Sequence, residues 1–508
     1  MFKDKKGKRM KRQRKEIHMA FGAALALAAG CLHLPSVGPS YETPTFEHPD
    51  YALLDAGLPT DTLASNGVYK VAEEDTRTEI TTNELTKWWT RFNDPVLVDL
   101  VESARTNNLS FQMAVWRLSQ SEYELLGSAA AFLPAFDVGA AWKKSRYEQD
   151  ASTSGFATRY QAQSLTLDGN WEIDIFGGNR RQCEAALAKA EAAGWTVADA
   201  WVSLTTQIGT QYINLRTTQA RLDVARTNLV LQTETYEILK SRLDSGIGDE
   251  LAVNQCAYVV EQTRASLPPL LAEEERLKND LAILAGKTPG ELDEVLQPLA
   301  EPRDWLLEPQ KVSALPLDLI RSRPDVIVAE RELAAVVASI GVAKAQWFPK
   351  LYITGQVGWQ NTKGERLFSK DSFFALLGPA VSWPIFQGGA IYANVKATEA
   401  KAQQAALNYE LAVETAYSDV RNAYAAYTQE YHRNKSLEMA VKAATDAVAI
   451  SKDLYKNGLK DFNNVLDAQR SRLSLEESYV VSRGQITLDL IALYRALGAG
   501  VPQPEPRD

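Results

Sequence analysis

An internal repeat constrains the fold of this chain more than any other feature of its sequence. Residues 167–178 are matched by residues 377–389, and residues 242–246 by residues 454–458, at an offset of about 212 residues. In each copy, two strand-like segments precede a long helical segment, a glycine-containing turn and a second helical segment. The sequence therefore predicts one structural unit that is built twice.

The strand-like segments alternate between apolar and polar residues. Odd positions of residues 164–175 are apolar or glycine and even positions are polar, and residues 136–143 and 351–360 also alternate. Strands between lipid and an aqueous lumen show this pattern, but so does a soluble sheet with one buried face. Alternation leaves both interpretations open, and the export signal described below favours the membrane. Aromatic residues, which gather at membrane interfaces, fall towards the strand ends at Trp142, Phe176, Trp359, Trp383 and Phe386.

Two strands in each copy give four strands per chain, which is too few to close a barrel. Open sheet edges are not tolerated in lipid, and spanning barrels begin at about eight strands. If the sheet lies in a membrane, several chains must complete it.

Long segments without proline follow the strands. Residues 178–245 and 388–457 contain no proline, and each is predicted to form one helix of about 100 Å. Residues 95–131 and 249–285 are predicted to form shorter helices of about 55 Å. Alanines are frequent at the strand-proximal ends of the long helices, where small side chains let neighbouring helices approach closely. A free coiled coil is the alternative, but leucine and isoleucine keep no strict heptad.

The N-terminus resembles an export signal. A basic run is followed by an apolar run at residues 19–30, which is too short to span a bilayer and ends directly before Cys31. A cysteine after Ala-Ala-Gly resembles a bacterial lipoprotein processing site, so Cys31 is expected to become the lipidated first residue. A plain signal peptide with an incidental cysteine is the alternative, because Ala28 stands where such a site usually has leucine. In both cases the mature chain works outside the cytoplasm.

Charge and residue spacing argue against several classes of function. The net charge is −9 although the first 30 residues are basic, and an acidic chain is a poor binder of nucleic acid. The four histidines show no metal-ligand spacing, and no nucleophile, base or carboxylate pair has a catalytic arrangement. We therefore expect no enzyme, no cofactor and no metal site.

Two short patterns have structural explanations. Gly286 and Lys287 resemble the end of a phosphate loop, but Leu281 stands where the first glycine of that loop belongs. They are expected to cap a helix instead. Cys183 and Cys256 are predicted to lie far apart along one helical hairpin, so they are expected to remain unpaired.

A set of short motifs runs along the whole mature chain. These are Cys31 and residues 37–44, 88–95, 171–177, 319–325, 340–349, 465–470 and 493–498. Together they resemble the bacterial outer-membrane efflux protein family, the TolC-like ducts, in its lipoprotein branch. Three places depart from the family pattern: Ala28 before the lipid site, Ser322 in place of a common arginine, and residues 498–501 in place of a glycine run ending in tryptophan.

The resemblance implies an α+β membrane protein that works as a homotrimer. Each chain would supply four strands to a 12-stranded β-barrel in the outer membrane, continued by a long periplasmic α-helical barrel with an equatorial domain. The implied segments are a signal peptide (1–30), a lipid-anchored extended and equatorial segment (31–94), the first repeat (95–300), the second repeat (301–500) and a C-terminal tail (501–508).

The implied function is passive conduction of small molecules from the periplasm, or from a pump, to the exterior. The partners would be an inner-membrane pump and a periplasmic adaptor, or membrane fusion protein, of a tripartite efflux system in a Gram-negative bacterium. The chain would be held by outer-membrane lipid and reach into the periplasm. A periplasmic adaptor is the alternative function, although the doubled strand pairs argue against it. A nutrient porin would need many more strands in one chain.

The two turns and the helix after the second turn are the candidate functional sites. Gly246 and Gly458 are expected to mark the periplasmic end and the adaptor-docking surface, with a purely structural turn as the alternative. Just past Gly458 the resemblance implies a constriction in which three Asp467 carboxylates repel each other and attract cations. A solvated helix charge is the alternative for Asp467. The expected constriction residues are Tyr455, Asn464, Asp467 and Arg470, with Asn464 and Asp467 on one helix face.

We predict that the mature protein begins at Cys31 and that this residue carries lipid. The reason is the Ala-Ala-Gly-Cys ending of the apolar run. Mass spectrometry of the mature N-terminal peptide measures this directly. An unmodified Cys31, or cleavage at another position, would reject the prediction.

Overall fold

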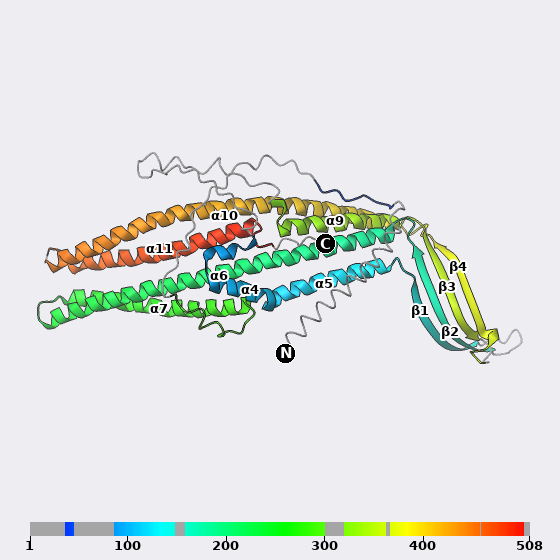
Figure 1. Cartoon of the computed structure of the whole chain (residues 1–508), viewed down its shortest axis with the longest axis horizontal. Coiled ribbons are helices and arrows are strands. Elements are labelled where there is room, and N and C mark those ends of the chain that lie inside the picture. Colours follow the sequence, from blue (N-terminus) through cyan, green and yellow to red (C-terminus); the bar gives the residue numbers. More distant parts are fainter. Residues whose placement is uncertain are drawn as a thin grey trace. The chain divides into compact units, whose positions relative to one another are not determined.

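The structure is a computed structural model that describes residues 36–44, 86–147, 158–299, 320–361, 366–457 and 459–501. Cys31, the expected signal peptide and Gly458 lie outside these residues. Figure 1 shows the helices and strands of the chain. In chain order they are η1 (Trp88–Phe92), α4 (Pro95–Asn107), α5 (Leu109–Ala130), β1 (Ala135–Tyr147), β2 (Thr158–Ile173), α6 (Gly178–Asp244), α7 (Glu250–Leu284), α9 (Pro324–Ala345), β3 (Lys350–Asn361), η2 (Lys370–Ser372), β4 (Phe373–Ser382), α10 (Ala390–Lys456) and α11 (Phe462–Ala496).

Two compact units share the chain. The strand unit contains the four strands and the helix ends nearest to them in sequence. The hairpin unit contains η1, α4, α7, α11 and the remaining parts of α5, α6, α9 and α10. The strand unit comprises Met1–Thr45, Arg117–Gly194 and Val328–Glu410, and the hairpin unit comprises Phe46–Trp116, Trp195–Ile327 and Leu411–Asp508.

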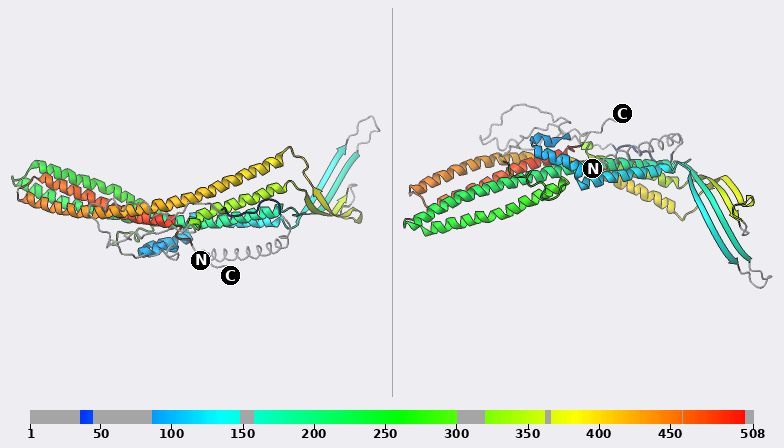
Figure 2. Two further views of the ribbon diagram at one scale, coloured as in Figure 1. Left: turned by 90° about the horizontal axis from the view of Figure 1, so that it is seen from above. Right: turned by 60° about the horizontal axis from the view of Figure 1, so that its bottom comes forward.

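The strand unit holds one antiparallel sheet of four strands in the order β1-β2-β3-β4 (Figures 1 and 2). Its register gathers the predicted apolar positions on one face, because Leu167 of β2 pairs with Val138 of β1 and with Val357 of β3. Much of this face is open to solvent in the single chain. Val138 is 74% exposed and Leu377 of β4 is 82% exposed. The predicted alternation is confirmed, and it produces an apolar face that is left largely uncovered.

Each strand pair is tied by a tryptophan to the end of the helix before it. The indole N–H of Trp171 donates a hydrogen bond to the carbonyl of Phe132, which follows α5, at 2.9 Å. The indole N–H of Trp383 donates in the same way to the carbonyl of Trp347, which follows α9, at 3.0 Å. Trp171 and Trp383 lie about 212 residues apart, so both copies of the pattern use the same contact.

An N-terminal strap, residues 36–44, lies against α6 and α9 in the strand unit. The backbone N–H of Val37 donates to the carbonyl of Phe176 at 3.1 Å. Arg181 of α6, which is buried, donates to the carbonyls of Val37 and Gly38 at 3.3 and 3.2 Å. These contacts hold the beginning of the strap beside the segment that follows β2.

The far end of the strap is held by α9. The hydroxyls of Tyr41 and Thr43 donate to the carboxylate of Glu330 at 3.3 and 3.1 Å. Burial and the charge of Glu330 raise the pKa of Tyr41 to about 12, so its hydroxyl keeps the proton that it donates. Tyr41 also packs on alanines of α6 and α9, which leave room for its ring.

Two long helical hairpins, α6–α7 and α10–α11, lie side by side in the hairpin unit (Figures 1 and 2). A large hydrophobic cluster joins them, with Ile208 of α6 and Ile491 of α11 fully buried. Trp88 of η1 inserts into this cluster and stacks on Tyr494 with 5.7 Å between ring centroids. Glycine is required at Gly209, because a Cβ there would lie 2.6 Å from the Trp88 ring. None of the helices in the described part of the chain is long and apolar enough to cross a membrane.

The helix predicted over residues 95–131 is wrong in one respect, because Asn108 divides it into α4 and α5. Asn108 has an extended backbone, and its side-chain oxygen caps α5 by accepting from the N–H of Phe111 at 2.8 Å. Its side-chain amide donates to the carbonyl of Leu284, 176 residues away, at 2.9 Å. A partner so distant in sequence leaves no periodic signal near residue 108.

Two other local expectations are confirmed. Gly286 follows α7 with a φ of +69°, and the N–H of Lys287 donates to the carbonyl of Ala282 at 2.8 Å, as in a Schellman cap. Cys183 and Cys256 are both free thiols.

We predict that Gly341→Ala in α9 displaces the strap. A Cβ at Gly341 would lie 2.6 Å from Cγ of Arg181 and 2.8 Å from the carbonyl oxygen of Val37. Overpacking of this kind costs about 1–3 kcal/mol, and residues 36–44 should become accessible to protease.

Gly127→Ala in α5 is the matched control, because a Cβ at this helical glycine would meet nothing within 4 Å. It should leave stability unchanged or raise it by about 0.5–1 kcal/mol. Thermal unfolding and limited proteolysis compare the two variants. Identical behaviour of both would show that the strap does not need the space at Gly341.

Candidate functional site at the hairpin turns

The α6–α7 turn closes around a glycine in the left-handed conformation. Gly246 has a φ of +75°, and the N–H of Ile247 donates to the carbonyl of Arg242 at 3.1 Å. This is the hydrogen bond of a Schellman cap. Asp249 then caps α7 by accepting from the N–H of Leu251 at 3.0 Å. Because a Cβ at Gly246 would meet nothing within 4 Å, backbone conformation selects glycine there and crowding does not.

The α10–α11 turn closes with the same backbone contact. The N–H of Leu459 donates to the carbonyl of Leu454 at 2.9 Å, about 212 residues after the matching pair in the first turn. Asn464 donates from its N–H and from its side-chain amide to the carbonyl of Asp461, at 3.2 and 3.3 Å. Gly458, the expected counterpart of Gly246, lies outside the described residues.

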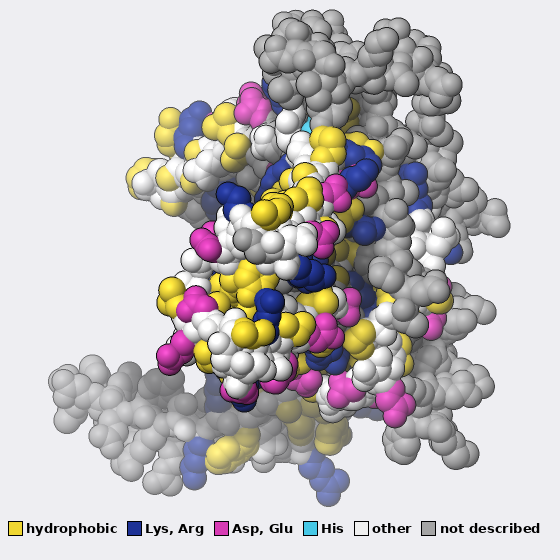
Figure 3. Space-filling model, turned by 90° about the vertical axis from the view of Figure 1, so that its left-hand side faces the viewer, with side chains coloured by type: hydrophobic (Ala, Val, Ile, Leu, Met, Phe, Trp, Pro, Cys, Tyr) yellow, Lys and Arg dark blue, Asp and Glu magenta, His cyan; other side chains and the backbone are white. Residues whose placement is uncertain are grey.

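Both turns present an exposed apolar side chain at the same position. Ile247 is 75% exposed and Leu459 is 67% exposed. Figure 3 faces the end of the molecule that carries both turns, where hydrophobic side chains are mixed with charges of both signs. A single exposed apolar residue is common on protein surfaces, but here equivalent positions of both turns carry one.

A small hydrophobic cluster packs the two turns together. Tyr455 lies at its edge with its ring centroid 5.3 Å from that of Phe462. Burial raises the pKa of Cys256, which lies inside the cluster, to about 11, so its thiol stays protonated. The buried members are Leu239, Ala252, Val253, Cys256 and Val259 from the first hairpin and Phe462, Val465 and Leu466 from the second.

Two arginines cross between the hairpins beside this cluster. The Arg242 guanidinium of α6 lies 5.6 Å from the ring centroid of Tyr455 in α10. In the opposite direction, Arg470 of α11 lies 5.0 Å from the ring centroid of Tyr258 in α7. Each such cation–π contact contributes about 0.5–1 kcal/mol at an exposed site.

Sequence reasoning missed two members of these pairs, Arg242 and Tyr258. Tyr258 and Arg470 lie about 212 residues apart and thus hold equivalent positions in the two copies. Aligning the copies around Arg470 would have singled out Tyr258. Arg242 has leucine at its equivalent position and carries no such signal.

The expected constriction residues lie near the second turn, in α10 and α11. Arg470 pairs with Asp467 within α11, at 3.7 Å between Nη1 and Oδ1. The Asp467 side chain is 75% exposed, and Asn464 is exposed one turn before it. Tyr455 contributes its ring, through the contacts with Phe462 and Arg242. This geometry fits a constriction residue and also fits a solvated helix charge at Asp467.

Farther from the turns, polar side chains link α6 to α11. The side-chain amide of Asn228 donates to Glu476 at 2.9 Å, and its oxygen accepts from Arg472 at 3.0 Å. Arg221 pairs with Glu477 at 3.3 Å. These links connect the first hairpin to the second between the turn cluster and the large hydrophobic cluster.

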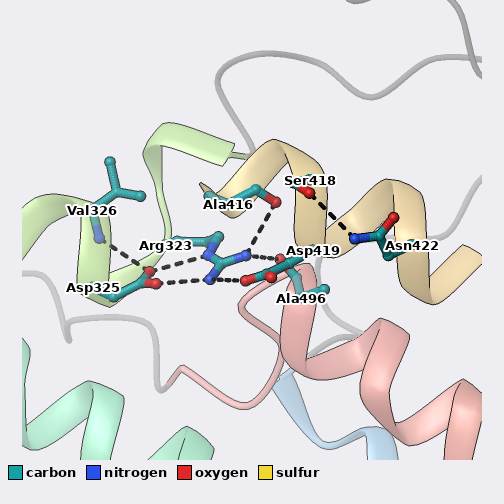
Figure 4. A network of polar contacts seen from close by, with 8 residues as sticks. All are labelled: Arg323, Asp325, Val326, Ala416, Ser418, Asp419, Asn422 and Ala496. Atoms are coloured by element: carbon teal, nitrogen blue, oxygen red, sulfur yellow. Dashed lines mark hydrogen bonds and ion pairs between the residues drawn. The ribbon is translucent and has the colours of Figure 1, made fainter. Parts of the chain in front are cut away.

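A buried arginine, Arg323, joins three helices where α11 ends (Figure 4). Its guanidinium donates to the carbonyl of Ala416 in α10 at 3.3 Å and to the carbonyl of Ala496 at 2.9 Å. Asp325 of α9 and Asp419 of α10 pair with it at 2.7 and 3.2 Å. Burial opposes the charge, but these two carboxylates raise the pKa of Arg323, so it stays a cation. The arginine of the 319–325 motif therefore caps α11 and holds it to α9 and α10.

A cavity of ≈ 360 Å³ lies among the helix ends of the strand unit, lined by polar side chains together with alanines and a valine. Four helices line it, namely α5, α6, α9 and α10, and most of the lining side chains suit contact with water. In the described part of the chain, no group of acidic, histidine or cysteine residues could hold a metal ion. The longer polar residues of the cavity wall are Glu124, Gln182, Lys189, Gln346 and Asn394.

Comparison with known proteins finds relatives along almost the whole chain. The model of the family described as outer membrane efflux protein matches residues 100–287 and 315–499. Nodulation protein T of Rhizobium leguminosarum bv. trifolii is 29% identical over 93% of this chain and 95% of its own length. Outer membrane protein OprJ of Pseudomonas aeruginosa is 27% identical, with coverage of 95% and 96%. Among solved structures, the outer-membrane channel OprN is 31% identical over 91% of this chain and 99% of its own, with a TM-score of 0.79.

We predict that Arg323→Ala destabilises the protein by about 2–4 kcal/mol. Two carbonyls lose their donor and two carboxylates lose their partner, but both carboxylates are partly solvated, which limits the loss. Arg323→Lys keeps the charge without the planar fork and should fall between alanine and the wild type.

Arg276→Ala in α7 is the control for this prediction. Arg276 also contacts two carboxylates, Glu273 and Asp280, but its side chain is 54% exposed, so its removal should change stability little. Urea unfolding of the variants gives the comparison. A loss at Arg323 no larger than that at Arg276 would exclude a stabilising role for the buried network.

Proposed function

Because the chain belongs to the outer membrane efflux protein family, we propose that it is the outer-membrane channel of a tripartite efflux system. It conducts small molecules passively from the periplasm, or from a pump, to the exterior. The observation that carries the proposal is the exposed apolar face of the four-stranded sheet, in a chain that also forms two long helical hairpins. Relatives that match nearly the full chain are an outer membrane protein and an outer-membrane channel, which supports the same function.

The working form in this proposal is a homotrimer. The sheet order leaves β1 and β4 as edge strands, and lipid does not satisfy the hydrogen bonds of an open edge. Pairing β1 of one copy with β4 of the next would close three sheets into a 12-stranded barrel, within the usual range for outer-membrane barrels. Val138 and Leu377 would then contact lipid, while Asp168 and Gln356 on the polar face would line water.

The proposed location is the outer membrane, with a lipid anchor at Cys31 and the hairpins in the periplasm. Ser36 lies close to Gly177, which follows β2. The closeness is seen from the space at Gly177, where a Cβ would fall 2.8 Å from the Cα of Ser36. Five residues reach at most about 18 Å, so a lipid on Cys31 would lie near the helix-side edge of the sheet. This short reach supports a periplasmic anchor for the strand unit.

The two turns are the proposed docking surface for a periplasmic adaptor, which connects the channel to an inner-membrane pump. The exposed Ile247 and Leu459, next to Gly246 and Gly458, would present two apolar contacts per chain and six per trimer. Ile247→Asp with Leu459→Asp should stop export while trimer and outer-membrane localisation persist. Undiminished export by this variant would place docking elsewhere.

The function is tested in a Gram-negative strain that lacks its own channel but keeps a matching adaptor and pump. The chain should lower accumulation of a fluorescent efflux dye, and it should fractionate with outer-membrane proteins. Release with soluble periplasmic proteins would favour the adaptor alternative, and unchanged dye accumulation would contradict the channel function.

We predict that Asp467→Ala changes single-channel conductance or cation selectivity, because three exposed carboxylates in one ring attract cations. Arg470→Ser with Tyr455→Leu should raise conductance, because it removes both cation–π contacts that hold the second turn to the first. Gln255→Ala is the matched control, since Gln255 holds the position equivalent to Asp467 in the first copy. Channels that behave alike in all variants would place the constriction elsewhere.

A further inference from the structure

Two consecutive prolines lie inside α7. Pro268 and Pro269 fall within a helix that continues from Glu250 to Leu284. Proline has no N–H, so the carbonyls of Arg264 and Ala265 lose the hydrogen bonds that these two positions would otherwise donate. Arg264 and Ala265 are exposed, so water can solvate their carbonyls. The helix is thus continuous in conformation but interrupted in its backbone hydrogen bonding.

The equivalent helix of the second hairpin has no such interruption. α11 also has 35 residues, and Val480 and Val481 stand where α7 has its prolines. Both valines can donate backbone hydrogen bonds. At this level α11 is also fixed to α10, because the hydroxyl of Ser482 donates to Glu430 at 2.6 Å. The two hairpins therefore differ in backbone hydrogen bonding at the same distance from their turns.

The prolines also separate two groups of contacts along α7. Cys256 belongs to the turn cluster, whereas Leu277 belongs to the large hydrophobic cluster. Hydrogen bonds between α6 and α7 divide in the same way. Cys256 contacts the carbonyl of Gln232 at 3.8 Å on the turn side, and Gln219 donates to Glu274 at 3.0 Å on the other side. Between these two contacts, the described residues of α6 and α7 form no side-chain hydrogen bond with each other.

We propose that Pro268 and Pro269 form a hinge, on which the turn end of α7 moves while the rest of α7 stays fixed in the large hydrophobic cluster. Helices bend most readily where proline removes backbone hydrogen bonds. This inference rests on the proposed function in one respect, namely that the motion is used when the channel opens.

Hydrogen–deuterium exchange of the full-length protein tests the hinge. In the wild type, amides of residues 251–267 should exchange about tenfold faster than those of residues 463–479. Pro268→Ala with Pro269→Ala restores both donors, so it should slow exchange over residues 251–267 and leave residues 463–479 unchanged. Equal exchange of the two segments in the wild type, or exchange rates of residues 251–267 that the double substitution leaves unchanged, would overturn the inference.

Pro289→Ala is the matched control, because Pro289 lies in the turn after α7 and outside the helix. It should leave the exchange of residues 251–267 as in the wild type. If Pro289→Ala also slowed the exchange of residues 251–267, the effect would be general stabilisation, and the hinge would be rejected.

Export separates the hinge from the proposed function. Dye efflux restored by the double variant should be at least about twofold lower than that restored by the wild type, because the turn end of α7 no longer moves about the prolines. Wild-type efflux by a variant whose exchange has slowed would overturn the role of the hinge in opening. If the wild-type chain itself restores no efflux, the proposed function fails, and the exchange rates still decide whether the hinge exists.

Discussion

The hydrophobic contact between the two helical hairpins is the interaction on which the rest of the hairpin unit depends. Burying a large apolar side chain such as Ile208, Leu215 or Ile491 contributes about 1.5–3 kcal/mol. A cation–π pair such as Arg470 with Tyr258 contributes about 0.5–1 kcal/mol. The apolar contact therefore sets how the hairpins lie. The polar links and ring contacts contribute less, so a change in these contacts near the turns leaves the hydrophobic contact between the hairpins in place.

The two copies of the pattern share their backbone and differ in their side chains. Both turns close with the same backbone hydrogen bond, and both strand pairs are tied by a tryptophan. Yet Tyr258 of the first copy is equivalent to Arg470 of the second copy, and these two side chains contact each other. Likewise, Pro268 of the first copy is equivalent to Val480 of the second. Such differences let one chain combine two unlike arms, of which one carries the exposed Asp467 and the other the interrupted helix.

Features that depend on local sequence were predictable. Strand alternation, the long helices without proline and the glycine at Gly246 follow from side-chain period and backbone freedom. Features that depend on distant partners were not. The break at Asn108 needs the carbonyl of Leu284, and the anchoring of the strap needs Arg181. The expected constriction residues were named by resemblance, and they remain a prediction. Tyr258 was missed because the two copies were not aligned around Arg470, although the offset of about 212 residues relates the two positions.

The contacts of the strap impose an order on the folding of the chain. Tyr41 and Glu330 are separated by 289 residues, so their hydrogen bond belongs to the slowest class of contact, in which a very long loop must close. Gly38 seats against Gly341, a surface that exists only after α9 has formed. The strap is synthesised early, but it can bind only after α9 in the second half of the chain has formed. A chain whose strap is bound has therefore already formed α6 in its first half and α9 in its second half.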